Sequence, residues 1–201
     1  YFTMNLVVYS FHLYRGPFIV DYLQLGKGYV GLSGTLMGLA SFPCITLWSG
    51  LADRLGRHKM VLSLITIAAV LCFELLFLRL QSMTLRFLYT TLMLMLYSAF
   101  LAGMQPLLDY EALELLSSKP GFSKELYGRQ RLWGTVAYSC ITLGGAYLMK
   151  VFGGFEVLGV IMPAAAVVFV ATLHFTALPD KPKRFTLRAE NERELVEKRV
   201  D

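Results

Sequence analysis

The stretch Gly50-Leu51-Ala52-Asp53-Arg54-Leu55-Gly56-Arg57-His58-Lys59 decides how this sequence folds. It combines two glycines, one acid and several basic side chains, and apolar runs flank it at about 32–51 and 60–78. A helix that crosses a bilayer needs about 20 mostly apolar residues, so both runs are long enough to span a membrane. The stretch is therefore predicted to be a short charged hairpin between two membrane helices.

The composition of the whole chain is that of an integral membrane protein. Hydrophobic residues make up 56% of the sequence, charged residues only 16%, and the mean hydropathy is +0.55. Soluble domains usually carry about 25% charged residues. The net charge of +5 resides in short links between apolar runs. We therefore expect a lipid bilayer, and no nucleic acid, as the surroundings of this chain.

Six apolar runs are present, and none alternates with the period of a strand. They predict an all-α membrane protein with six transmembrane helices, at about 1–23, 32–51, 60–78, 87–108, 132–150 and 156–178. Glycine and proline within the runs are expected to mark kinks or close helix contacts. The six helices form one unit, 1–178, and a charged linker follows at 179–201.

The basic residues fix the predicted orientation. Most of them lie in the links after the second and fourth runs and in the tail after the sixth run. Because positively charged links stay in the cytoplasm, both termini are predicted to be cytoplasmic. We expect the plasma membrane rather than an organelle.

The hairpin residues have individual physical roles. Gly50 would allow close approach of a neighbouring backbone, and Gly56 would permit the tight turn. Asp53 is placed to sit at a helix N-terminus, with Arg54 and Arg57 as possible ion-pair partners. The alternative is that the positive charge of the stretch serves orientation alone.

In order and spacing, the ten residues resemble the signature loop between the second and third spans of the major facilitator superfamily of transporters. The resemblance implies the amino-terminal six-helix half of a major facilitator fold, built as a 3+3 inverted repeat. It also implies a second, C-terminal six-helix half as partner, supplied by the same full-length chain or by a second copy. The loop would then act as a cytoplasmic gate, through Gly50, Asp53, Arg54, Gly56, Arg57 and Lys59.

A second constellation joins the fourth and fifth runs. Asp109 follows Pro106 by three residues, and Arg131 lies in the run Gly128-Arg129-Gln130-Arg131-Leu132-Trp133-Gly134. A loop of about 20 residues could bring the two charges together, and a carboxylate beside a guanidinium can bind hydroxyl groups. The two segments resemble the lactose-permease-like branch, which includes nucleoside–proton symporters, and there the matching residues contact substrate. Asp109 and Arg131 could instead form an interfacial ion pair that caps two helix ends.

Two further candidates lie in the first run. His12 and Arg15 are three residues apart and share a helix face. A buried arginine there could bind an anionic or aromatic substrate. Alternatively, Arg15 reaches the outer interface or pairs with Asp21. Glu111 and Glu114, beyond the fourth run, are expected to be solvated.

The predicted function is secondary active transport, with proton-coupled uptake of a small polar solute (a sugar, nucleoside or organic acid) by alternating access. A non-transporting receptor or scaffold of the same fold, and an antiporter or exporter, are the alternatives. The sequence has no Walker loop, no HExxH or GxSxG motif and no metal-spaced Cys/His set. We therefore expect neither an enzyme nor a bound cofactor or metal.

Overall fold

The computed structural model describes residues 1–78, 80–117 and 124–175, and these residues form helices without any strand. The elements are α1 (Phe2–His12), α2 (Arg15–Pro17), the π-helical η1 (Phe18–Tyr22), α3 (Lys27–Leu55), α4 (His58–Leu75), α5 (Met83–Leu101), α6 (Met104–Ser117), α7 (Lys124–Phe152), the 3₁₀ turn η2 (Phe155–Val157) and α8 (Leu158–Phe175). The predicted linker 179–201 and the last residues of the sixth run lie outside the described residues.

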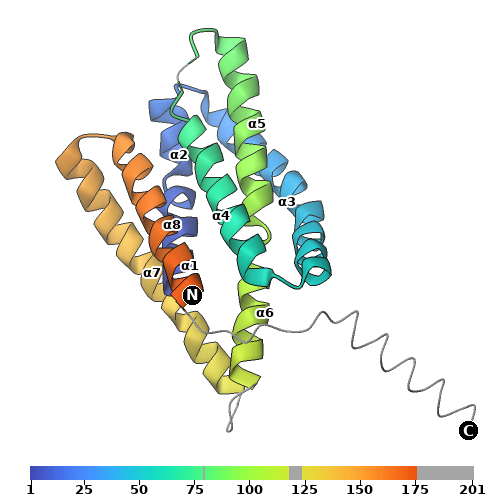
Figure 1. Ribbon diagram of the computed structural model, residues 1–201. Helices are drawn as coiled ribbons and strands as arrows, with labels where there is room; N and C mark the ends of the chain where they lie inside the picture. The colour runs from blue at the N-terminus through green and yellow to red at the C-terminus, as the bar shows by residue number, and fades with distance from the viewer. Residues whose placement is uncertain (79, 118–123, 176–201) are drawn as a thin grey trace, which may run out of the picture.

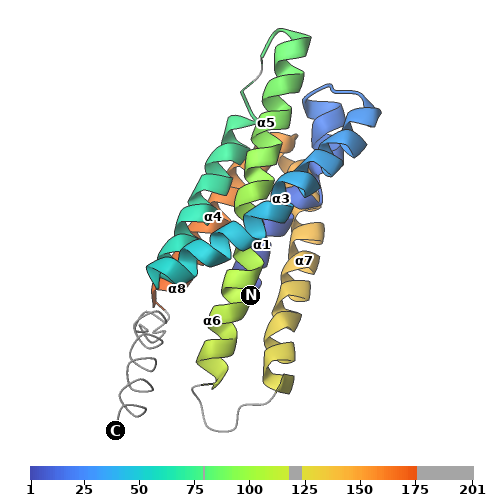
Figure 2. The same ribbon diagram turned by 90° about the vertical axis from the view of Figure 1, so that its right-hand side faces the viewer.

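The helices run up and down as a bundle (Figures 1 and 2). The start of α1, the α3–α4 turn and the facing ends of α6 and α7 lie towards one end of the bundle, at the bottom of Figure 1. The α4–α5 and α7–α8 links lie towards the other end. In the packing, α1 contacts α7 and α8, α5 contacts α3 and α4, and α4 contacts α8.

Five segments are long and apolar enough to cross a membrane, at Lys27–Leu55, His58–Leu75, Met83–Leu116, Leu126–Phe152 and Phe155–Phe175. The first apolar run, predicted as one helix over 1–23, is instead divided into α1, α2 and η1. The membrane character of the chain is thus confirmed, whereas a count of six spans stays a prediction.

Proline explains why the first run is interrupted. Pro17 has no N–H, so the helical hydrogen bond that its position would donate is missing. The chain turns at Leu13 and Tyr14, and η1 then closes with a wider bond from the N–H of Leu23 to the carbonyl of Phe18 at 3.0 Å. The hydroxyl of Tyr14 donates to the carbonyl of Ile141 on α7 at 2.9 Å. A side chain at the break thereby ties the first run to the fifth.

The fourth run is also interrupted, between α5 and α6 at Ala102 and Gly103. Glycine and proline within the runs were expected to mark kinks, and the break beside Gly103 and Pro106 confirms that expectation. The indole Nε1 of Trp48 on α3 donates to the carbonyl of Ala99 at 2.8 Å. This bond supplies a partner to a carbonyl in the last turn of α5, where helical partners run out.

The predicted link of about 20 residues between the fourth and fifth runs is wrong. Helix α6 continues to Ser117 and α7 begins at Lys124, so only 118–123 lie between them. The end of α6 and the start of α7 have polar sequences, so the apolar runs gave helices that were too short. The consequence is that Asp109 and Arg131 lie within helices rather than at the ends of a loop.

Candidate substrate site and charged loop

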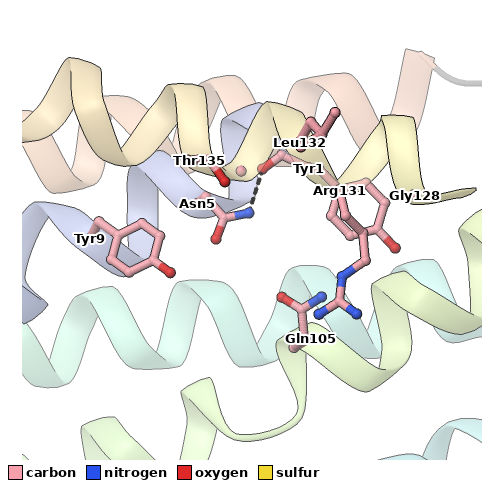
Figure 3. Close-up of a pocket in the computed structure, with 9 residues that line it drawn as sticks. Tyr1, Asn5, Tyr9, Gln105, Gly128, Arg131, Leu132 and Thr135 are labelled. Atoms are coloured by element: carbon pink, nitrogen blue, oxygen red, sulfur yellow. Dashed lines mark hydrogen bonds between the residues drawn. The ribbon is translucent and has the colours of Figure 1, made fainter.

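A cavity of about 310 Å³ lies between α1, α6 and α7. Its polar lining comes from all three helices, and Figure 3 shows Asn5, Gln105 and Arg131 turned towards it. The described residues that line it are Tyr1, Asn5, Tyr9, Gln105, Gly128, Arg131, Leu132, Gly134 and Thr135. Small-molecule sites commonly measure about 300–1,000 Å³, so the space suits a small solute.

Asp109 lies beside this cavity as a hydrogen-bond acceptor within the protein. Its Oδ1 accepts a hydrogen bond from the hydroxyl of Tyr1 and another, at 2.8 Å, from Nε2 of Gln105. Gln105 precedes Asp109 by one helical turn, so α6 presents both side chains on one face. Asp109 therefore fixes two residues that line the cavity and does not itself line it.

Arg131 lies on the opposite wall. Its guanidinium carbon is 5.8 Å from the ring centre of Tyr127, one turn earlier on α7. Tyr127 in turn makes an edge contact with Tyr1, with ring centres 6.4 Å apart. Among the described residues no ion pair joins Arg131 to Asp109, so the predicted direct pair is replaced by a chain of two tyrosines. Arg131 is exposed.

The helices that bound the cavity approach closely at Asn5. A Cβ atom on Gly134 would lie 2.7 Å from Nδ2 of Asn5, so only glycine fits there without a shift. Nδ2 of the buried Asn5 donates to the carbonyl of Tyr1 at 2.9 Å. This donation leaves the amide oxygen of Asn5 to face the cavity, as Figure 3 shows.

Several lining residues were not predicted from sequence. Gln105 had a usable signal, because it lies four residues before Asp109 in an apolar run. Asn5 had a weaker one, as the only amide in the first half of the first run. Tyr1, Tyr9 and Thr135 had none, because tyrosine and threonine recur in the first, fourth and fifth runs without any distinguishing pattern.

The first-run candidates lie elsewhere. Arg15 is half-buried, and its Nη1 donates to the sulfur of Met37 on α3 at 3.3 Å. Its expected alternative partner, Asp21, forms no ion pair with it among the described residues. His12 is exposed, one turn before Arg15. Neither residue lines the cavity, so the structure places the four predicted substrate residues in two separate regions.

The turn in the charged loop is confirmed at Gly56. Gly56 ends α3 with φ 62° and ψ 22°, in the left-handed region that favours glycine, and its N–H donates to the carbonyl of Ala52 at 2.9 Å. Gly50 differs from expectation. A Cβ atom there would meet nothing within 4 Å, so no described part of this chain approaches it closely.

Asp53 pairs with a residue that was not predicted. Its Oδ1 lies 3.1 Å from Nε2 of His58, the first residue of α4. Asp53 does not cap that helix, because no side chain of the described residues forms a hydrogen bond at the N-terminal cap of α4. No ion pair joins Asp53 to Arg54 or Arg57 in the described part of the chain, and both arginines are exposed. Lys59 is half-buried beside them. The expected acid–arginine pairs are therefore wrong.

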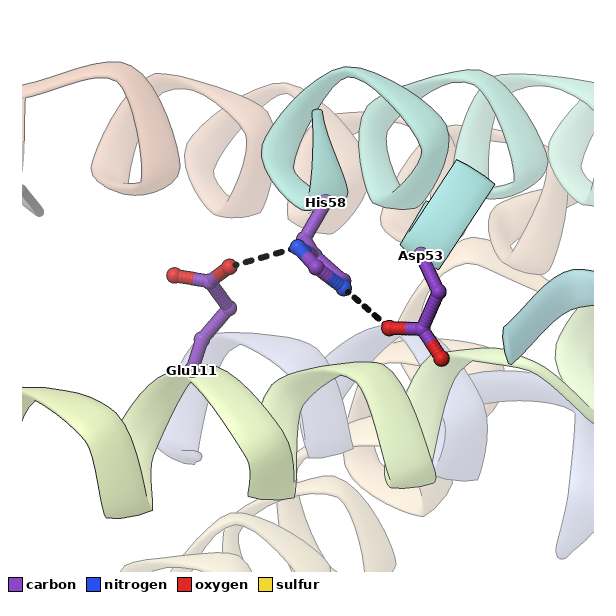
Figure 4. Close-up of polar contacts among 3 residues, drawn as sticks. All are labelled: Asp53, His58 and Glu111. Atoms are coloured by element: carbon purple, nitrogen blue, oxygen red, sulfur yellow. Dashed lines mark hydrogen bonds and ion pairs between the residues drawn. The ribbon is translucent and has the colours of Figure 1, made fainter. Parts of the chain in front are cut away.

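Nδ1 of the same histidine lies 3.5 Å from Oε1 of Glu111 on α6 (Figure 4). The Glu111 side chain is only 13% exposed, so the expectation that it is solvated is also wrong. Among the described residues, no three His, Cys, Asp or Glu side chains are arranged to hold a metal ion.

The described helices thus form a bundle of membrane length with a polar cavity between them, as in a multi-pass membrane protein. The model of the MFS_1 like family matches residues 1–199, and the chain belongs to this family, within the major facilitator superfamily. No curated protein and no solved structure matches the chain.

Proposed function

We propose that this chain is the amino-terminal half of a secondary active transporter that takes up a small polar solute together with protons. Membership in the MFS_1 like family indicates a transporter. The observation that carries the finer proposal is the cavity between α1, α6 and α7, with its exposed arginine and two amides.

The chemistry of the cavity favours a solute with acceptor oxygens. Arg131 offers several N–H donors in a planar fork, which suits a carboxylate or a pair of hydroxyls. Asn5 and Gln105 add amide groups that fix orientation. Asp109 acts one step away, because it holds Tyr1 and Gln105 in place.

The packing supports an inverted repeat. In the repeat, α1, α3 and α4 of the first three spans correspond to α5, α7 and α8 of the last three. Helix α1 contacts α7 and α8, and its counterpart α5 contacts their counterparts α3 and α4. The α4–α8 contact joins two corresponding helices. The two interrupted runs, at Tyr14 and at Gly103, occupy corresponding positions in this scheme. Interrupted helices in corresponding positions are a pointer to substrate sites in transporters.

In this proposal a C-terminal half closes the other side of the solute site, and the two halves rock about it. In the orientation that we propose from the positive charge of the links, the α3–α4 turn is cytoplasmic. Because the cavity lies towards the same end of the bundle, it would be the cytoplasmic part of the pathway.

The test is uptake by the full-length protein in cells or proteoliposomes. The probes are a radiolabelled disaccharide, a nucleoside and an aromatic carboxylic acid, each with and without an inward proton gradient. We expect one class to accumulate with the gradient, and Arg131→Ala to abolish accumulation while the protein still reaches the membrane. A protein that reaches the membrane and accumulates none of the three would favour a receptor or scaffold.

A further inference from the structure

One cluster has no part in the proposed solute site. It contains His58 at the start of α4, Asp53 at the end of α3 and Glu111 on α6. Figure 4 shows the imidazole between the two carboxylates. Glu111 is far from Asp53 and His58 in the sequence, so the cluster joins the charged loop to the part of α6 that lies beyond the fourth apolar run.

The geometry makes a specific demand on the imidazole. Nε2 faces Oδ1 of Asp53 at 3.1 Å, and Nδ1 faces Oε1 of Glu111 at 3.5 Å. A neutral imidazole has one N–H donor and one lone pair, whereas the imidazolium has two N–H donors. Only the imidazolium can donate towards both carboxylates. With a neutral ring, one carboxylate would face a nitrogen lone pair.

The surroundings hold the ring in place between the two carboxylates. The side chain of His58 is only 13% exposed, and its ring stacks on Tyr110 with centres 4.5 Å apart. Among the described residues, Asp53 from α3 and Tyr110 and Glu111 from α6 face the ring. The charged neighbours along the chain are Arg54, Arg57 and Lys59, with Glu114 one turn beyond Glu111. Asp53 is 57% exposed and gives solvent a route to the cluster.

A metal ion is a poor alternative occupant. The two carboxylates lie on opposite edges of the ring, so they cannot converge on one ion. No metal-holding group of three such side chains occurs in the described residues, which agrees with this geometry.

We propose that His58 is a proton-binding site, and that the bound proton fastens α6 to the α3–α4 turn. Helix α6 begins after the break at Gly103, so it is joined to α5 through a two-residue turn, Ala102 and Gly103, rather than a continuous helix. It also carries Gln105 and Asp109. Loss of the proton from His58 would release the α6 end and let this wall of the cavity move.

The experiment measures one distance at two pH values. Spin labels are placed at Leu55 on α3 and Leu113 on α6, both 41% exposed, in full-length protein in lipid nanodiscs without any solute. The native cysteines, Cys44, Cys72 and Cys140, are replaced first. We expect one short distance at about pH 5.5 and at least about a threefold larger long-distance population at about pH 8.5.

Three variants decide the outcome. His58→Gln should lose the pH response, His58→Arg should keep the short distance at both pH values, and the matched control His174→Gln should respond like the unmutated protein. A pH response that survives in His58→Gln would overturn the proposal, as would a constant distance in the unmutated protein.

A second measurement needs no substitution in the cluster. Nitrogen NMR of ¹⁵N-histidine distinguishes imidazolium from neutral rings, and the chain has 3 histidines to assign. Both nitrogens of His58 should be protonated at the pH that gives the short distance. A neutral ring there would overturn the proposal. Because no solute is present, failure here leaves the proposed transport function untouched.

Discussion

Tyr1 and Asp109 are joined by a hydrogen bond from the phenol to the carboxylate, across the wall of the cavity between α1 and α6. The same carboxylate oxygen accepts from Gln105 at 2.8 Å. Asp109 is thus occupied by the protein, while Arg131 on the facing helix has an exposed side chain. Asp109 therefore organises the cavity, whereas Arg131 is placed to bind a solute within it.

The first prediction concerns the bond itself. Tyr1→Phe and Asp109→Asn should each destabilise the protein, by about 1–2 kcal/mol, because each weakens a hydrogen bond to a charged group. The two effects should be coupled by at least about 0.5 kcal/mol, since the residues are in contact. Unfolding in detergent, followed for both single variants and the double variant, measures the coupling. Strictly additive effects would contradict the bond, and the exposed Asp21→Asn serves as control.

The second prediction uses two adjacent glycines on α7. A Cβ atom on Gly145 would lie 2.8 Å from the hydroxyl of Tyr14, whereas a Cβ atom on Gly144 would meet nothing within 4 Å. Gly145→Ala should therefore cost about 1–3 kcal/mol through overpacking. Gly144→Ala should be neutral or slightly stabilising, because alanine favours helix. Melting temperatures of the two variants give the comparison, and equal values would contradict the close contact between Tyr14, at the break after α1, and α7.

The third prediction concerns the break in the fourth run. Trp48→Phe removes the indole donor to the carbonyl of Ala99 while keeping an aromatic ring beside Phe100. We expect a loss of about 1–3 kcal/mol, because the carbonyl loses its side-chain partner. Trp133 is 55% exposed and is the matched control. Trp133→Phe should change stability by less than about 0.5 kcal/mol. If both variants melt alike, the indole bond does not stabilise the break.

Parts of this structure follow from sequence because they depend on local chemistry. The turn at Gly56 needs a positive φ, which glycine adopts readily, and the ten-residue stretch Gly50–Lys59 already predicted a turn there. The break after Leu101 also follows from local chemistry, because Pro106 lacks the N–H that a continuous helix would use and Gly103 weakens the helix beside it. The apolar runs found the membrane helices because hydropathy acts residue by residue.

Other parts depend on which surfaces meet, and one sequence does not contain that information directly. The partner of Asp53 is His58 rather than either arginine, and α6 brings Glu111 to the other edge of the same imidazole. Hydropathy does not detect the polar parts of α6 and α7, so these parts were predicted as a loop. Asp109 and Arg131 were therefore not recognised as residues within helices. Asn5 lines the cavity where α1 approaches Gly134 on α7, and the sequence does not show which helices approach each other.

The central claim, that Arg131 binds the transported solute, is tested most directly by comparing Arg131→Ala with Arg129→Ala. Both arginines are exposed on α7, and only Arg131 lines the cavity. In proteoliposomes with an inward proton gradient, the solute that the unmutated protein accumulates should be accumulated by Arg129→Ala and lost, by at least about tenfold, in Arg131→Ala. Equal accumulation by the two variants would contradict the account.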